Sequence, residues 1–256
     1  MNIYTNVLSG AKWFFDASVS IERDEWRSYI GSLNIQKTYP GIQGIGFSRV
    51  ILPQEKDSFV SAIRREWFPD FDITPEWKRD LYTSITFLEP FDERNKRAFG
   101  YDMFSESVRR KAMIWARDTG LPTLSWKVIL KQETDTDIQN GFLLYVPVYK
   151  NTWGIKNIFW YVYAPFRIKD FITSVIDPSH YSIAFQIFDW LRMNDENKLY
   201  VSDSFPVEND ELSFRDIKTL SIAGHPWTIE FVNSPQFKRN LIYIRLSYGI
   251  LALGFL

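Results

Sequence analysis

The 256-residue chain contains no cysteine, only two histidines and no excess of either charge sign. Without cysteine it can form no disulfide, no thiolate metal site and no cysteine nucleophile. His180 and His225 lie far apart in the sequence and lack acidic residues at ligand spacing, so neither a metal site nor a Ser-His-Asp triad is supported. A formal net charge of −1 provides no general attraction to nucleic acid. We therefore expect no catalytic activity, no metal, no cofactor and no nucleic-acid partner.

Long hydrophobic runs are almost absent as well. The N-terminal residues lack the basic start and the unbroken apolar stretch of a signal peptide. Only the segment Leu241–Leu256 becomes steadily more apolar, and its apolar part is shorter than the roughly 18 residues that a spanning helix needs. Two interpretations stay open for this segment: a buried terminal helix or strand, or the start of a membrane helix of which this chain contains only part.

The residues that are present indicate a folded protein with a substantial core. Hydrophobic residues make up 45% of the chain and charged residues 24%, a balance that is typical of globular domains. Aromatic residues reach 17% and include ten tryptophans. Most aromatic side chains in such a chain fill the core, and a minority line ligand pockets.

The N-terminal segment has the pattern of a helix. Residues 11–30 contain neither glycine nor proline, and Val7, Ala11 and Phe14 recur at helical spacing. The sequence TYPG at residues 38–41 is a strong break signal. We therefore predict one long helix over roughly the first 35 residues.

Beyond this helix, strand patterns alternate with helical patterns. The predicted elements of a first domain are a strand at 44–52, a helix from Pro53, a strand at 82–90, a helix from an N-cap at Ser105 to Gly120, and strands at 121–130 and 141–149. A second, shorter unit with its own strands and one helix is predicted from residue 157. This order of elements is typical of an α+β fold with antiparallel sheets.

The stretch FGYDMFSESVRRKAMIWARDTG, residues 99–120, raises the main question about function. Its Asp102 lies among aromatic residues just before the predicted helix, where an unpaired charge is costly. In one interpretation Asp102 is a structural carboxylate that accepts backbone N–H bonds at the helix end. In the other it is the polar group of an apolar ligand pocket, where a carboxylate can only accept hydrogen bonds and needs a donor. An arginine or lysine of this chain paired with the buried carboxylate would mean that the ligand interpretation is wrong and that the structural interpretation holds.

Together with its neighbours, this stretch resembles the CHASE domain family. AKWFFDASVSIERDEWRSYI followed by YPGIQGIGFSRVI is similar to the family's opening, and residues 99–130 with GFLLYVPVY resemble its most diagnostic block. HPWTIEFVNSPQF leading into an apolar segment resembles the closing strand and the second membrane helix. The resemblance covers almost the whole chain, and the order and spacing of its segments make it specific.

The resemblance implies a fold and a place in the cell. It implies a stalk helix at 1–38, a membrane-distal PAS-like ligand-binding lobe at 39–156, a membrane-proximal PAS-like lobe at 157–240 and the start of a truncated transmembrane helix at 241–256. CHASE domains are ligand-sensing domains on the outer side of the membrane in histidine kinases, diguanylate cyclases and nucleotide cyclases. The implied role is an extracytoplasmic sensor domain that passes a signal to a cytoplasmic output domain.

The resemblance also implies residues that contact a ligand. Plant members bind cytokinins, which are N6-substituted adenines, and the aspartate of a Gly-x-Asp stretch accepts hydrogen bonds from them. Asp102 stands at that position, Leu124 matches a pocket residue on the following strand, and Thr134 matches a hydroxyl contact. The aromatic surroundings depart from the plant pattern. The expected ligand is a small molecule with hydrogen-bond donors, adenine-like compounds among them.

Two further expectations concern assembly and the alternative function. Apolar residues of the predicted stalk helix, including Leu8, Phe15, Val19 and Ile21, spread over more surface than one contact with the lobes covers. We therefore expect this helix to pair with its counterpart in a symmetric parallel homodimer. The alternative to a receptor domain is a stand-alone soluble protein that binds small molecules or stacks its tryptophans on glycans.

Overall fold

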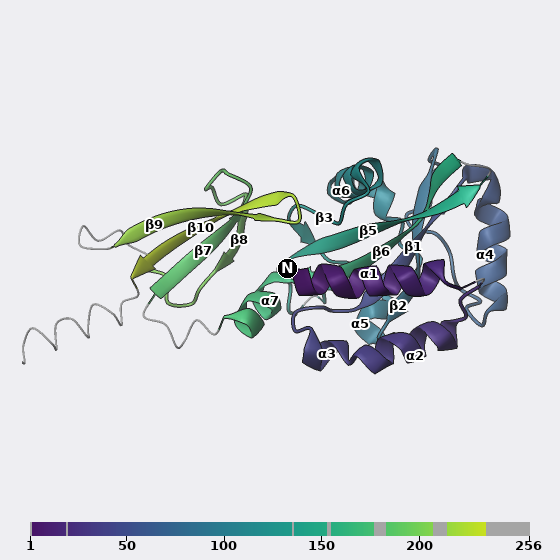
Figure 1. Ribbon diagram of the computed structural model, residues 1–256, viewed down its shortest axis with the longest axis horizontal. Coiled ribbons are helices and arrows are strands. Elements are labelled where there is room, and N and C mark those ends of the chain that lie inside the picture. The colour runs from purple at the N-terminus through teal and green to yellow at the C-terminus, as the bar shows by residue number, and fades with distance from the viewer. Residues whose placement is uncertain are drawn as a thin grey trace, which may run out of the picture. The chain divides into compact units, whose positions relative to one another are not determined.

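The computed structural model describes residues 2–18, 20–134, 136–152, 155–176, 183–206 and 214–233. The chain divides into two units within helix α7 (Ile168–Val175). The first unit comprises the residues up to Phe171 together with Ile222–His225, and the second comprises Ile172–Ser221 and the residues from Pro226 on. Figure 1 shows both units and labels most of their helices and strands.

The N-terminal segment is helical but folds back on itself. Its helices are α1 (Asn2–Asp16), α2 (Arg23–Leu33) and the short α3 (Ile35–Thr38). Glu22 starts α2 through a capping box with Glu25, and the ring of Phe14 on α1 stacks on that of Tyr29 on α2 at 4.6 Å. The prediction of one continuous stalk helix is therefore wrong, because a second N-terminal cap and aromatic contacts between α1 and α2 stabilise a helical hairpin.

The first unit is built on an antiparallel sheet with helices on both faces. The strand order is β2-β1-β6-β5-β3, and β4 also pairs with β5. The strands are β1 (Ile45–Ile51), β2 (Tyr82–Glu89), β3 (Thr123–Leu124), β4 (Val128–Ile129), β5 (Asn140–Thr152) and β6 (Ile155–Arg167). Every residue of β2 is buried, which requires that both faces of this strand are covered.

The two faces of this sheet carry different helices. The helices that complete the first unit are η1 (Pro53–Glu55), α4 (Lys56–Arg65), α5 (Glu93–Lys96), η2 (Met103–Ser105) and α6 (Ser107–Thr119). On one face Phe47 and Trp160 pack against Phe15 of α1 and Trp26 of α2. On the other face the core is formed by residues of the sheet together with residues of η2 and α6, including Tyr145, Tyr161, Tyr163, Met103, Ala112 and Met113.

The position of strand β6 shows that the predicted boundary between the lobes is wrong. We predicted that this strand opens the second lobe at residue 157, but it lies in the middle of the first sheet, between β1 and β5. The long hairpin β5–β6 pairs from Gly141 and Arg167 to Thr152 and Ile155. The units therefore separate in α7, after the hairpin has closed the first sheet.

The second unit has its own antiparallel sheet in the order β8-β7-β10-β9. Its strands are β7 (Ile183–Asp189), β8 (Lys198–Val201), β9 (Arg215–Ile222) and β10 (His225–Asn233). The strands β7 and β8 form an antiparallel hairpin. Two units, each with an antiparallel sheet, confirm the α+β class.

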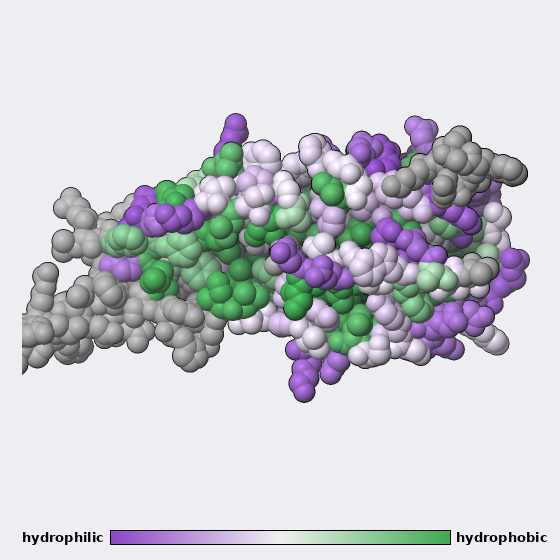
Figure 2. All heavy atoms as spheres, in the orientation of Figure 1, coloured by the Kyte–Doolittle hydropathy of each residue, from purple (hydrophilic) through white to green (hydrophobic). Residues whose placement is uncertain are grey.

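Some residues on which the predictions from the sequence rest lie outside the described residues. These include Val19 and the apolar segment Leu241–Leu256. Among the described ranges, no helix combines the length and the apolar character that crossing a bilayer requires. Hydrophilic and apolar side chains are interspersed on the face of the first unit that Figure 2 presents.

Candidate functional site

The segment Gly100–Asp102 runs beside β2 and is fixed at both ends. Asp102 forms a bridge with Ser84 of β2, and its N–H donates to the carbonyl of Thr74 at 2.7 Å. Gly100 has a φ of 80°, and a Cβ at this position would lie 2.3 Å from the carbonyl oxygen of Asp72. Only glycine allows this close approach of two backbones, so Gly100 fixes the path of the backbone that leads to Asp102.

The carboxylate of Asp102 is fully buried and has several partners from its own chain. Its Oδ1 accepts hydrogen bonds from the N–H of Thr83 at 2.8 Å, from Oγ1 of Thr83 at 3.0 Å and from the N–H of Phe104 at 3.0 Å. Its Oδ2 lies 2.7 Å from Nε of Arg79, in ion-pair contact but without hydrogen-bond alignment. The carboxylate thus caps η2 and neutralises a buried guanidinium.

Arg79 is held in a separate way. Its Nη2 donates to the carbonyl of Pro75 at 2.7 Å, and its guanidinium lies over the rings of Trp77 and Tyr82 at 5.2 and 5.0 Å. Its Nη1 is buried and has no hydrogen-bond partner among the described residues. Because Asp102 is buried against an arginine of its own chain, the prediction that this carboxylate waits for a ligand donor is wrong, and the structural interpretation holds. The helix predicted from Ser105 begins at Ser107 instead, capped by Glu106.

The structure does not bring the three predicted ligand contacts together. Leu124 is buried on β3, at the sheet edge opposite to β2, and it pairs with Leu144. Because the next residue of β5, Tyr145, faces α6, Leu124 and Leu144 lie on the other face of the sheet. Thr134 lies in the loop before β5, where its Oγ1 is 3.4 Å from that of Thr136. Ligand contacts of Leu124 and Thr134 therefore stay predictions.

The loop that carries Thr134 is anchored by a buried arginine. Arg167, at the end of β6, donates to Glu133 at 2.8 and 3.2 Å and to Asp170 at 3.0 Å. The same guanidinium donates to the carboxylate of Asp137 at 2.5 Å, and this hydrogen bond lowers the pKa of Asp137. These charges have partners within the chain, so the cluster fixes the loop.

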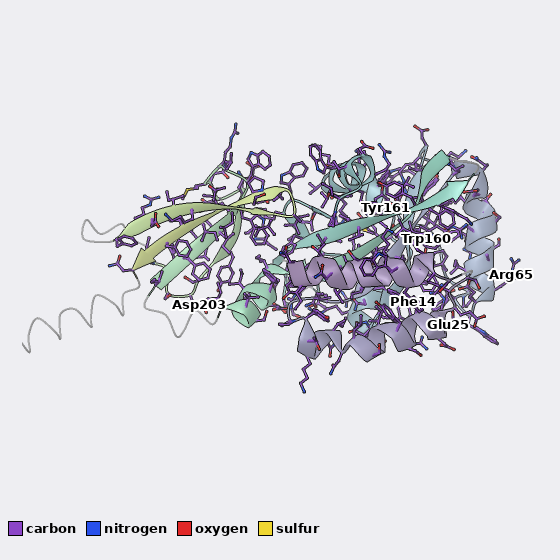
Figure 3. The ribbon with its side chains drawn as sticks, viewed as in Figure 1. Phe14, Glu25, Arg65, Trp160, Tyr161 and Asp203 are labelled. Carbon is purple, nitrogen blue, oxygen red and sulfur yellow. The ribbon has the colours of Figure 1, made fainter. Side chains whose placement is uncertain are left out.

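A second group of polar side chains lies on the sheet face beneath η2 and α6. Ser48 of β1 pairs directly with Tyr161 of β6, and Gly46 pairs with Tyr163. Direct partners and residues two apart share a face, so the three hydroxyl-bearing side chains point to the same side. Figure 3 labels Tyr161 and its neighbour Trp160, which packs on the face of α1. A Cβ at residue 46 would lie 2.9 Å from the Tyr163 hydroxyl, so glycine makes room for it.

These hydroxyls are buried without partners. Ser48, Tyr161 and Tyr163 are each 0% exposed, and none of their side-chain oxygens has a hydrogen-bond partner among the described residues. Burial raises the pKa of both tyrosines, so the phenols are neutral. A buried polar group left unpaired costs about 1–3 kcal/mol. Buried polar groups without hydrogen-bond partners are rare in native folds and need an explanation, and one such explanation is that they bind a ligand.

Sequence reasoning missed both Arg79 and the hydroxyl cluster of Ser48, Tyr161 and Tyr163. Arg79 lies in a loop 23 positions before Asp102 (102 − 79), and no local pattern joins the two. For the tyrosines a signal was present, because the alternation in YVY puts both hydroxyls on one face of a strand. Among the described residues, no group of three or more His, Cys, Asp or Glu side chains could hold a metal ion.

Comparisons with known proteins give a family and a fold. The family model for the CHASE domain matches residues 19–200. No curated protein sequence matches the chain. An extracellular ligand binding receptor from Desulfohalobium retbaense DSM5692 superimposes with a TM-score of 0.51 at 10% identity. This match covers 88% of the present chain and 36% of the other, so the chain spans about a third of that receptor structure.

Two chemoreceptor domains of Pseudomonas aeruginosa PAO1 are also similar in structure. The ligand binding domain of the amino acid chemoreceptor PctC, in complex with GABA, gives a TM-score of 0.46 at 7% identity, over 91% of each chain. That of PctB, in complex with L-Arg, gives 0.45 at 10% identity, over 95% of this chain and 87% of the other.

Proposed function

The chain belongs to the CHASE domain family, whose members are extracytoplasmic sensing domains, and we propose that it is the sensor of a membrane-anchored receptor. In this proposal the first unit binds a small molecule, and the signal passes through the N-terminal helices and a membrane segment to a cytoplasmic output domain. The role is sensory and not catalytic. Family membership favours this role over that of a stand-alone soluble binding protein.

The ligand site of this proposal lies between the sheet of the first unit and the segment η2–α6. The observation that carries it is the group of hydroxyls of Ser48, Tyr161 and Tyr163 on the sheet face beneath α6, which have no hydrogen-bond partner among the described residues. The pair Asp102–Arg79 lies on the same face, because Asp102 is bonded to Thr83, whose register partner Val50 packs against this core. A ligand held by a few polar groups within an apolar lining is the usual arrangement of a small-molecule site.

The chemistry of these groups indicates an uncharged ligand. Neutral hydroxyls both donate and accept hydrogen bonds, and the charges of Asp102 and Arg79 compensate each other at 2.7 Å. A charged ligand would find no unbalanced counter-charge there and would bear the full cost of leaving water. We therefore propose a neutral molecule with both donors and acceptors, which includes the adenine-like compounds expected from the resemblance. Entry requires η2 and α6 to move away from the sheet.

A homodimer through the N-terminal helices remains part of the proposal, with a changed surface. Leu8 is fully buried and the ring of Phe15 lies 4.3 Å from that of Phe47, so these residues serve the first unit's own core. Ile3 and Trp13 lie on the outer side of α1 and are exposed. Single cysteines at Asn6 in the full-length receptor should cross-link two copies, whereas cysteines at the buried Ala11 should not, and failure at both positions would refute this dimer.

A binding experiment tests the site. The isolated chain is screened by thermal shift against neutral small molecules that carry hydrogen-bond donors and acceptors. Each hit is then titrated against Tyr161→Phe and Tyr163→Phe, with Tyr200→Phe in the second unit as the matched control. We expect both first-unit variants to bind about 5- to 10-fold more weakly, the loss of one hydrogen bond, and the control to bind as the parent protein does. Hits that bind equally to all four proteins would refute the site.

A further inference from the structure

The strand β9 lies at one edge of the second unit's sheet (Figure 1). In the strand order β8-β7-β10-β9 it is hydrogen-bonded to β10 on one side, and no strand among the described residues pairs with its other side. A two-residue turn at Ala223 and Gly224, both with a positive φ, joins β9 to β10. Arg215 at the start of β9 is ion-paired with the buried Glu230 of β10. β9 is therefore fixed to β10 at both ends, and an edge of this kind presents backbone N–H and C=O groups to which another strand can bond.

β9 lacks the features by which proteins usually protect an edge strand. Such strands are kept short or are interrupted by proline or by unpaired lysines. β9 has eight residues and contains no proline or glycine, whereas β8 at the opposite edge has only four residues. Its one lysine, Lys218, lies 3.1 Å from Asp216 of the same strand, so this charge is already compensated.

Apolar side chains along β9 are exposed in the single chain. Phe214, just before the strand, is 66% exposed, and Ile217 and Leu220 are 46% and 48% exposed. Side chains alternate between the two faces of a strand, so Phe214 and Leu220 lie on one face and Ile217 lies on the other. A partner that pairs with β9 would cover apolar surface on both faces, which favours its binding.

A second copy of β9 fits this edge in one register. Antiparallel pairing of two identical edges closes under two-fold symmetry, so the residue at the axis defines the register. With Asp216 or Lys218 at the axis, like charges would lie directly opposite each other, and such pairs are destabilising. With Ile217 at the axis, Asp216 of each copy lies opposite Lys218 of the other copy, on the same face of the sheet.

The other cross-strand pairs of this register are also compatible. Ile217 lies opposite Ile217 of the second copy, Phe214 lies opposite Leu220, and Arg215 lies opposite Thr219. Opposite charges and apolar side chains that face each other across two strands each stabilise the pairing. The sequence of β9 is therefore complementary to itself when it runs antiparallel to a second copy.

We propose that β9 is a dimerisation edge, through which the four-stranded sheets of two copies of this chain join by antiparallel β9–β9 pairing centred on Ile217. The pairing uses the β9 edge of both copies and leaves only the short β8 at each end, so the assembly stops at two chains. This surface is separate from the outer side of α1. The proposal does not depend on the ligand site beneath α6.

Sedimentation equilibrium of the whole chain, up to roughly 1 mM because an interface of one strand is small, tests the charge pairs. Asp216→Lys and Lys218→Asp each place like charges opposite each other at two symmetry-related positions and should weaken dimerisation at least about 5-fold. The combined variant Asp216→Lys/Lys218→Asp brings opposite charges together again and should dimerise about as well as the parent chain. Lys198→Asp on β8 changes the net charge as Lys218→Asp does, and this matched control should leave dimerisation unchanged.

Cysteine cross-linking locates the two-fold axis, because the chain contains no cysteine of its own. Ile217→Cys places two thiols directly opposite each other, within reach of a disulfide, and oxidation should link the two copies. Ser221→Cys is the control, since Ser221 is also exposed on β9 but lies four residues from the axis (221 − 217 = 4). Its two copies would be about 27 Å apart and should not link.

Four results would overturn the proposal. They are a chain that stays monomeric at roughly 1 mM, a dimer that both single charge variants leave unchanged, a combined variant that does not restore dimerisation, and equal cross-linking at residues 217 and 221.

Discussion

Replacing Tyr161 with phenylalanine should make the ligand-free protein more stable. The Tyr161 hydroxyl is fully buried on the sheet face beneath α6 and has no hydrogen-bond partner among the described residues. Folding therefore removes this hydroxyl from water without replacing its hydrogen bonds. Phenylalanine keeps the ring and its contacts, such as that with Tyr145 at 6.3 Å, and omits only the oxygen.

The size of this gain follows from the cost of an unpaired buried polar group. That cost is about 1–3 kcal/mol, and the variant recovers it less any packing lost with the oxygen atom. We expect the free energy of unfolding to rise by about 1–2 kcal/mol. In a chain of this length each kcal/mol raises Tm by about 2–4 °C.

Urea unfolding of the ligand-free chain measures the effect. Tyr149→Phe is the matched control, because the Tyr149 hydroxyl donates to the carbonyl of Arg117. Its removal should destabilise by about 0.5–1.5 kcal/mol. If Tyr161→Phe destabilises the chain as much as Tyr149→Phe does, the Tyr161 hydroxyl is paired in the free protein and the reasoning about the site fails.

Other perturbations test the groups around this site. Asp102→Ala leaves Arg79 buried without its counter-charge and should lower the free energy of unfolding by about 3–5 kcal/mol in urea titrations. A loss below about 1 kcal/mol would mean that the ion pair contributes little to stability. Gly100→Ala forces a Cβ to 2.3 Å from a backbone oxygen at a positive φ, so it should cost more than about 1 kcal/mol, and a neutral result would contradict the described backbone. The hydrogen bond from Arg167 lowers the pKa of Asp137 below its ordinary value of about 3.9, so this pair stabilises the fold above that pH and the contribution is lost as pH falls through the lower folded value. Asp137→Asn should therefore flatten the acid dependence of the urea midpoint, and an unchanged dependence would count against the pair.

Local signals in the sequence were sufficient for most elements of the fold. Gly120 ends α6 in the left-handed conformation with a φ of 74°, as its position after the helical pattern predicted. The strand patterns at 44–52 and 82–90 became β1 and β2. These elements depend on neighbours in the sequence, and a single chain displays such neighbours directly.

Features that depend on distant residues could not be predicted in this way. The turn between α1 and α2 contains neither glycine nor proline, and it is stabilised by contacts such as Phe14 with Tyr29. The position of β6 in the first sheet depends on its pairing with β1, more than a hundred residues earlier (160 − 49 = 111). Asp102 could be recognised as a costly buried charge, but its partner Arg79 could not, because a loop residue carries no periodic signal.

Amide hydrogen exchange of the chain, with and without a ligand from the thermal shift screen, tests the central claim most directly. A ligand between the sheet and α6 should slow exchange in η2, α6 and the neighbouring part of β6, because the segment that opens for entry is then held closed. Tyr161→Phe should reduce this protection at the same ligand concentration. Protection confined to the second unit, or to α2, would contradict a ligand site beneath α6.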